Sequence, residues 1–162
     1  MVPLHEVKIM NNGKTSVNIY TDGSWWQNRQ GSAAVFNIKN DWYFITEYMD
    51  YGTNNRAELL GPIIALEFLK KHKINFNVIN IYSDSQYVIN TINNGWRKRK
   101  NVDLWQRIDP LLDLSRQNYR WVRGHDGNIG NELADRFANE CQETKTSTTK
   151  LTKIDNETGL KI

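Results

Sequence analysis

Hydrophobic and polar residues alternate along two short segments that each end in an aspartate. Residues 16–24 alternate up to Asp22, and residues 80–85 alternate up to Asp84. A period of two is typical of β-strands. An apolar segment of helical length separates them. The pattern therefore predicts a βαβ unit with an aspartate at the end of each strand.

Such crossover connections are right-handed and leave the strands parallel, so Asp22 and Asp84 should lie at the same edge of the sheet. Neighbouring strands are about 4.8 Å apart. Two like charges at that distance repel by about 4 kcal/mol at an effective dielectric constant near 20. A shared proton, a basic side chain or a bound cation could relieve this repulsion. Oxygen ligands suit Mg²⁺ or Mn²⁺, and we interpret the pair as half of a metal site, although either aspartate alone would be typical of a turn or a helix N-cap.

The remaining pattern predicts an α/β protein. Two alternating segments joined by a short turn indicate an antiparallel hairpin, and periods near 3.6 indicate helices. A polar loop with Trp25 and Trp26 is expected between the first strand and this hairpin. The expected elements are a hairpin over 33–39 and 42–49, helices over 56–73, 85–94, 102–117 and 129–143, and strands over 76–83 and 119–123.

Length and composition predict one domain. The chain has 162 residues, a net charge of +3 and a single cysteine, Cys141, which excludes an intramolecular disulfide and fits a reducing compartment. No apolar run approaches the length of a membrane span. We expect a flexible extension over 1–14, a folded domain over 15–143 and a disordered tail over 144–162, which is rich in Thr, Lys and Ser. A cytoplasmic protein without membrane contact is expected.

Four acidic residues are candidates for a common site. Asp22 and Asp84 end strands, and Glu58 and Asp135 fall near the starts of two predicted helices. Ligands gather at such positions in α/β folds. A carboxylate in the first turn of a helix is also favoured by the helix dipole, so spacing alone does not show that the four converge.

Six ordered blocks resemble type 1 ribonuclease H. They cover roughly residues 16 to 141 and read Thr21-Asp22-Gly23-Ser24, Thr53-Asn54-Asn55-Arg56-Ala57-Glu58-Leu59, Ser83-Asp84-Ser85-Gln86-Tyr87-Val88, Asn101-Val102-Asp103-Leu104-Trp105, Trp121-Val122-Arg123-Gly124-His125 and Gly130-Asn131-Glu132-Leu133-Ala134-Asp135. The resemblance implies a ribonuclease H-like fold, with a five-stranded mixed sheet flanked by helices. It also implies an endonuclease that hydrolyses the RNA strand of RNA/DNA hybrids and leaves 5′-phosphate and 3′-hydroxyl ends.

The resemblance further implies a set of functional residues. Two Mg²⁺ ions, or Mn²⁺ in their place, would be held by Asp22, Glu58, Asp84 and Asp135, and His125 would assist proton transfer or product release. Asn28, Asn54, Asn55 and Gln86 match positions that contact the minor groove of the hybrid, and Thr53 matches a phosphate-pocket position. Taken alone, the amides would be read as turn formers and His125 as an exposed loop residue.

The chain lacks the basic helical handle of many ribonucleases H. In its place, residues 97–100 form a short basic run with Arg97 and Lys98. Such a run is usually a solvated face, but it could also follow a phosphate backbone. A monomer is expected.

Three alternatives remain open. A DNA-cutting nuclease of the same fold, such as a junction resolvase or an integrase-like enzyme, would lack the Asn-Asn-Arg-x-Glu and Asp-Ser-Gln blocks. A non-catalytic hybrid-binding module would be indicated by loss of an acid, yet all four are present. The third alternative is a domain cut from a reverse transcriptase.

Overall fold

The computed structural model describes residues 16–95, 98 and 100–155. The extension expected over residues 1–14 lies outside the described residues, as do Arg97 and the end of the expected tail. Among the described residues, no helix has both the length and the apolar character needed to cross a membrane.

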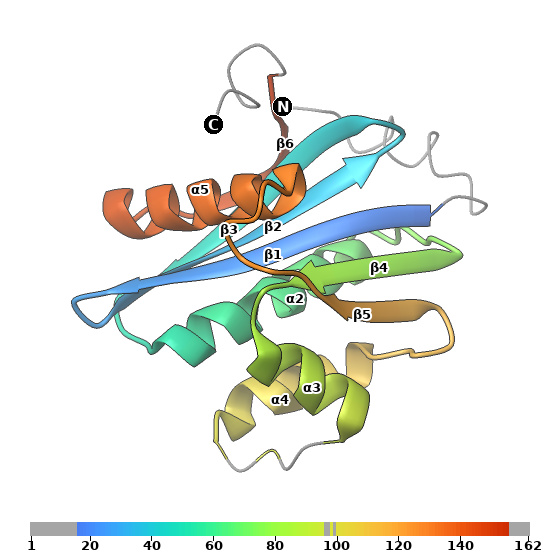
Figure 1. The fold of residues 1–162 in the computed structure, drawn as a ribbon, viewed down its shortest axis with the longest axis horizontal. Helices are drawn as coiled ribbons and strands as arrows, with labels where there is room; N and C mark the ends of the chain where they lie inside the picture. The colour runs from blue at the N-terminus through green and yellow to red at the C-terminus, as the bar shows by residue number, and fades with distance from the viewer. Residues whose placement is uncertain (1–15, 96–97, 99, 156–162) are drawn as a thin grey trace.

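A mixed sheet forms the centre of the molecule (Figure 1). Its strand order is β5-β4-β1-β2-β3-β6, in which β1, β4 and β5 are parallel and the pairings of β1 with β2, β2 with β3 and β3 with β6 are antiparallel. The mixed sheet agrees with the prediction, but within the described part of the chain it has six strands where five were expected. The strands are β1 (Ser16–Trp26), β2 (Arg29–Ile38), β3 (Asp41–Met49), β4 (Val78–Ser83), β5 (Gln117–Trp121) and β6 (Thr148–Lys153).

The register of β1 and β4 confirms the predicted βαβ unit. Thr21 pairs with Ser83, so the residues that follow them, Asp22 and Asp84, lie at the same edge of the sheet. The alternation seen in the sequence matches burial along β1, where Val17 and Ile19 are buried.

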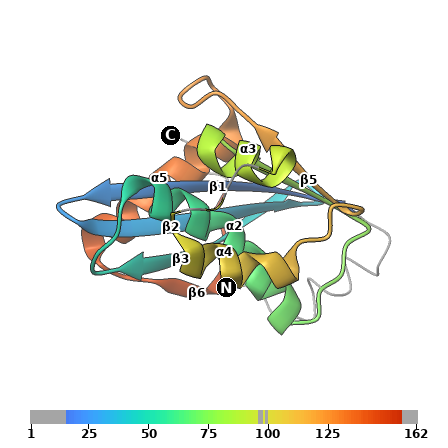
Figure 2. The same ribbon diagram turned by 90° about the horizontal axis from the view of Figure 1, so that it is seen from below.

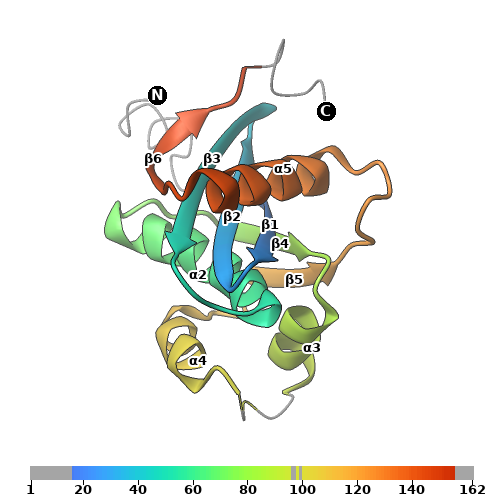
Figure 3. The ribbon, with the colours of Figure 1, turned by 90° about the vertical axis from the view of Figure 1, so that its left-hand side faces the viewer.

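Helices cover both faces of the sheet. Helix α2 (Asn54–Lys71) packs on β1 and β2 on one face, and α5 (Ile129–Thr144) packs on β1, β2 and β3 on the other (Figure 3). The short helices α3 (Gln86–Asn94) and α4 (Val102–Ile108) lie on the α2 side, and α4 contacts α2 (Figure 2). The main core therefore lies between the sheet and α2.

The helix expected over residues 102–117 is shorter than predicted. Helix α4 ends at Ile108, a 3₁₀ turn covers Asp109–Leu111, and Leu112 is extended. Pro110 explains the difference, because proline has no N–H to donate and its ring clashes with the preceding turn of an α-helix.

The expected polar loop around Trp25 and Trp26 is instead a tight hairpin. Strand β1 continues to Trp26 and β2 begins at Arg29. The connecting residues Gln27 and Asn28 both have positive φ, 51° and 65°, as a two-residue hairpin turn of type I′ requires. The two tryptophans are therefore held on a strand.

The expectation of a disordered tail from residue 144 is wrong for its first part. Residues 148–153 form β6, which pairs with the edge of β3 and buries Leu151. Beyond the strand, Ile154 is buried and its N–H donates to the Trp42 carbonyl. The unpaired N–H and C=O groups of an edge strand favour such addition, and threonine suits strands despite the polar composition.

Candidate active site

Three carboxylates converge at one edge of the sheet. Contrary to the prediction, Asp22 does not end its strand, because β1 continues to Trp26, but it directly follows the last residue of β1 that pairs with β4. Asp84 directly follows β4, and Glu58 lies in the second turn of α2. Their carboxylate oxygens lie within 4.8 Å of one another. Asp22 and Glu58 are buried, with 5% and 8% of their surfaces exposed. We call these three residues the acidic triad.

Close contact between β1 and α2 brings two of these acids together. A Cβ atom on Gly23 would lie 2.3 Å from the carbonyl carbon of Ala57 and 2.5 Å from the Glu58 nitrogen, so glycine is required at this approach. The Gly23 N–H donates to the Glu58 carboxylate, and it also lies 2.9 Å from Asp22 Oδ1. The Asp-Gly sequence thus places a backbone donor between two acidic side chains.

Burial dominates the electrostatics of the triad. The pKa of Asp22 is raised to about 7, mainly by loss of hydration and also by the charges of Asp84 and Asp135, while hydrogen bonds with Glu58 and Gly23 offset part of the shift. Burial also raises the pKa of Glu58 well above its usual value, and the charge of Asp22 adds to this effect. The site therefore binds protons in the absence of a cation.

The donor set fits a divalent metal ion. Carboxylate oxygens are the ligands that Mg²⁺ and Mn²⁺ prefer, and a cation would relieve the repulsion that raises both pKa values. Among the described residues, the triad is the one group of three His, Cys, Asp or Glu side chains close enough to share an ion.

Asp135 lies near the triad but outside this tight group. It is half-buried on α5, and its negative charge acts on Asp22. The fourth predicted acid thus approaches from the face of the sheet opposite α2.

The loop that follows β5 lies beside Asp84. Trp121 Nε1 donates to the Asp84 carbonyl at 3.0 Å, and a Cβ on Gly124 would lie 2.8 Å from Asp84 Oδ2. The next residue, His125, is exposed and has a φ of 57°. The structure therefore places the predicted histidine one residue from a direct neighbour of the triad.

The candidate substrate contacts lie around the same edge. Thr53 is the N-cap of α2, and its hydroxyl accepts a hydrogen bond from the Arg56 N–H at 3.2 Å. Asn54 and Asn55 open α2, and Gln86 opens α3. Asn28 occupies the tight turn after β1, and like Thr53, Asn54, Asn55 and Gln86 it is exposed.

Lys98 is engaged within the protein. It forms an ion pair of 2.8 Å with Asp109 and lies over the Trp105 ring, 5.3 Å from its centroid. Because Arg97 lies outside the described residues, the predicted phosphate contact of the basic run stays a prediction.

The sequence interpretation missed a network that fixes the start of α2. Arg56 forms a two-pronged ion pair with Asp103 of α4, with distances of 2.8 and 2.7 Å. The Tyr87 hydroxyl of α3 accepts from Asn101 and Trp105. Arg56 and Asp103 occur in the blocks quoted above, but a sequence does not say which of many opposite charges pair.

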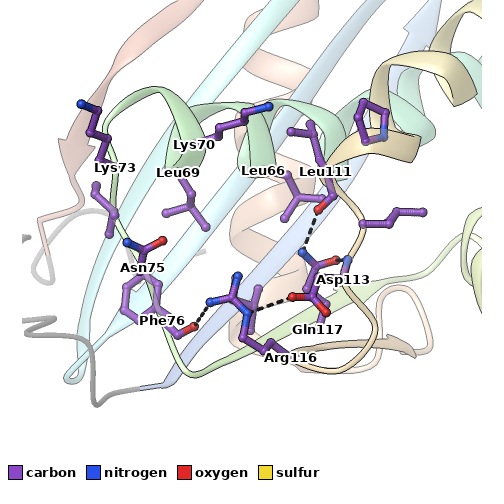
Figure 4. A pocket seen from close by; sticks show the side chains of 14 residues that line it. Leu66, Leu69, Lys70, Lys73, Asn75, Phe76, Leu111, Asp113, Arg116 and Gln117 are labelled. Atoms are coloured by element: carbon purple, nitrogen blue, oxygen red, sulfur yellow. Dashed lines mark hydrogen bonds and ion pairs between the residues drawn. The ribbon is translucent and has the colours of Figure 1, made fainter.

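Figure 4 shows a cavity whose lining includes none of the three acids of the triad. It has a volume of about 470 Å³ and is bordered by the second half of α2, the segment before β4 and the residues around Leu111. Arg116 on its rim pairs with Asp113 at 3.1 Å and donates to the Phe76 carbonyl. The lining of this cavity contains no cluster of acids. The triad therefore remains the candidate for catalysis.

Comparison with known proteins places the chain in a family. The RNase H family model matches residues 14–143. Ribonuclease H of Shewanella denitrificans is 40% identical over 144 residues, covering 80% of this chain and 88% of the relative. Ribonuclease HI of Shewanella oneidensis is 39% identical over 142 residues, covering 78% and 87%.

Solved structures agree in fold. LC9-RNase H1, described as a type 1 RNase H with the type 2 active-site motif, superposes with a TM-score of 0.77 at 22% identity, covering 89% of this chain and 80% of its own. The N-terminal RNase H domain of a Mycobacterium tuberculosis protein gives a TM-score of 0.69 at 25% identity, with coverages of 80% and 95%. Since the family model spans most of the residues that build this sheet and its acidic triad, the protein belongs to the RNase H family.

Proposed function

We propose that this protein is an endonuclease that hydrolyses the RNA strand of RNA/DNA hybrids with two divalent cations, Mg²⁺ or in its place Mn²⁺. The products would carry 5′-phosphate and 3′-hydroxyl ends. The observation that carries the proposal is the acidic triad, with two of its three carboxylates buried, in a chain of this family. We further propose that the enzyme acts as a monomer.

Asp22, Glu58, Asp84 and Asp135 are the residues that would hold the cations. Held there, a pair of divalent cations would supply the chemistry to activate a water and to stabilise the leaving 3′ oxygen of an in-line displacement. The carboxyls of Asp22 and Glu58 must lose their protons to act as ligands, so cation affinity rises with pH. We assign His125 a role in moving a proton or releasing the product.

The amides around the site suit a hybrid substrate. Asn28, Asn54, Asn55 and Gln86 can donate to and accept from base edges in the minor groove, where sequence readout is weak. The 2′-hydroxyl is the group that distinguishes RNA from DNA.

Thr53 and the basic run would bind phosphates of the hybrid. The Thr53 hydroxyl accepts from Arg56 N–H, which leaves its proton to donate to a phosphate oxygen. The N-terminus of α2 favours an anion there. Arg97 and Lys98 would contact phosphates of the hybrid that lie away from the cleaved bond.

The direct test is cleavage of end-labelled RNA/DNA, RNA/RNA and DNA/DNA duplexes with Mg²⁺, Mn²⁺ or EDTA. We expect cleavage of the RNA strand of the hybrid alone, no cleavage in EDTA, and RNA products that a ligase can rejoin. Asp22→Asn should abolish turnover and keep hybrid binding, whereas the distant Asp113→Asn should cleave normally. Full activity in EDTA or in Asp22→Asn would overturn the two-cation mechanism, and cleavage of DNA/DNA would favour a DNA-cutting nuclease.

A further inference from the structure

Besides Trp121, which donates to the Asp84 carbonyl, three large aromatic side chains are exposed near the acidic edge. Trp25 and Trp26 end β1 with 42% and 61% of their surfaces exposed, and Tyr51 in the segment before α2 is 69% exposed. Asp22 lies on the same strand, three residues before Trp25. None of these three aromatic residues is among the proposed metal ligands.

Trp25 lies on the α2 side of the sheet. Side chains along a strand alternate between faces, and position 23 of β1 contacts Ala57 and Glu58 of α2, so position 25 points the same way. Trp25 Nε1 donates to the Gly52 carbonyl at 3.0 Å. This bond fixes the ring beside the segment that leads from Tyr51 to the exposed amides of Asn54 and Asn55.

Trp26 lies on the opposite side, towards α5. Every second residue back along β1 from Trp26, namely Ser24, Asp22 and Tyr20, lies on the same face of the sheet as Trp26. Tyr20 packs closely against Gly130 of α5. The Trp26 carbonyl accepts from Gln142 Nε2 at 3.2 Å. Trp26 lines a hollow of about 460 Å³ with Arg29 and α5 residues, and Trp25 borders it as well.

We propose that Trp25 and Tyr51 form a non-ionic contact for the sugars of the RNA/DNA hybrid, and that Trp26 takes no part in it. The inference rests on the proposed function. Within a duplex the bases stack on one another, and the wide minor groove of an A-form helix displays the sugars. Aromatic rings that bury apolar surface there add affinity.

The two adjacent tryptophans give a matched pair of variants. Binding is measured by fluorescence anisotropy with a labelled hybrid in the Asp22→Asn background, which removes cleavage from the measurement. Trp25→Ala should weaken binding about tenfold, at the low end of what loss of a base-stacking ring costs a single-strand-binding protein, and Tyr51→Ala should weaken it several-fold. Trp26→Ala should change it less than twofold.

Salt dependence separates a sugar contact from a phosphate contact. Losing one phosphate contact reduces the slope of log affinity against log salt by about 0.9 for a duplex of B-type charge density. Trp25→Ala should leave the slope unchanged. Trp25→Phe keeps an apolar ring without the Nε1 donor, so it should lose less affinity than Trp25→Ala and guards against a variant that fails to fold.

The inference would be overturned if Trp25→Ala and Trp26→Ala lost equal affinity for the hybrid. It would also be overturned if both Trp25 variants bound the hybrid as tightly as the wild type. So would a reduced salt slope in Trp25→Ala. These outcomes are distinct from failure of the proposed function, because binding and cleavage are measured in separate experiments: a wild-type protein that binds the hybrid and leaves it intact contradicts the function alone.

Discussion

At the scale of single residues, Asp22 shows how function opposes stability. Its carboxyl is buried next to two other acids, and its pKa is raised to about 7 from an ordinary value near 4. Between these two values the folded state binds more protons than the unfolded state. The free energy of unfolding therefore falls as the pH rises from about 4 to 7, and the cation-free protein should be less stable at pH 8 than at pH 5.

Replacing Asp22 by asparagine should remove this penalty. In EDTA, we expect Asp22→Asn to be more stable than the wild type at pH 8, by about 2–4 kcal/mol. The difference should shrink towards pH 4, and urea unfolding at several pH values measures it. Asp113→Asn is the control, and it should lower the free energy of unfolding where Asp22→Asn raises it. The reason is that hydrogen bonds from Ser115 and Arg116 lower the pKa of Asp113. A pH-independent difference would contradict this explanation.

A second residue, Gly23, should tolerate no side chain. In Gly23→Ala the new methyl group would meet the backbone of Ala57 and Glu58, which cannot move without separating β1 from α2. We expect a loss of about 1–3 kcal/mol in stability and a larger loss of cleavage, because the Glu58 carboxylate moves with α2. Ser24→Ala on the same strand adds no atoms and should behave like the wild type. Thermal unfolding and activity of the folded fraction measure both effects.

At the scale of elements, the sequence predicted what periodicity and turn chemistry encode. The βαβ unit, the β2–β3 hairpin and the starts of α2 and α5 follow from local patterns. The tight Gln27-Asn28 turn and β6 do not, because each depends on a partner strand. The threonine-rich residues 148–153 become ordered because β3 offers them an unpaired edge.

The same distinction applies to the candidate site. Positions near predicted element ends made Asp22, Glu58 and Asp84 candidates, the resemblance to ribonuclease H implied that they share a site, and the fold brings all three together. It did not indicate that Arg56 pairs with Asp103, because that contact joins α2 to α4 over 47 positions of the chain. Contacts of this length depend on packing rather than on spacing.

The ordered tail yields a prediction about stability. Leu151 of β6 is only 3% exposed, so Leu151→Ala should lower the free energy of unfolding by about 2–4 kcal/mol, as expected for a buried leucine. Lys150→Ala, its exposed neighbour, should change it by less than about 0.5 kcal/mol. Urea denaturation of the two variants is the test. Equal stability of both with the wild type would mean that β6 contributes nothing to the folded state in solution.

At the scale of the whole molecule, the triad couples cation binding to the stability of the entire fold. Its members come from β1, from α2 and from the segment between β4 and α3, so unfolding separates the ligands. A cation that binds the folded state alone stabilises it by RT ln(1 + [L]/Kd), which is about 2.7 kcal/mol when the cation concentration is 100 times Kd. For a chain of this size, 1 kcal/mol corresponds to about 2–4 °C in Tm.

We therefore expect Mg²⁺ or Mn²⁺ at saturating concentration to raise Tm by about 5–10 °C. The increase should be larger at pH 8 than at pH 6, because protons compete with the cation at Asp22 and Glu58 when the pH lies below their raised pKa values. Asp22→Asn should lose most of the increase, even though it starts from a higher Tm in EDTA at pH 8. Potassium chloride at matched ionic strength controls for screening of surface charges. An equal rise in Tm for the wild type and Asp22→Asn would place the bound cations elsewhere on the protein.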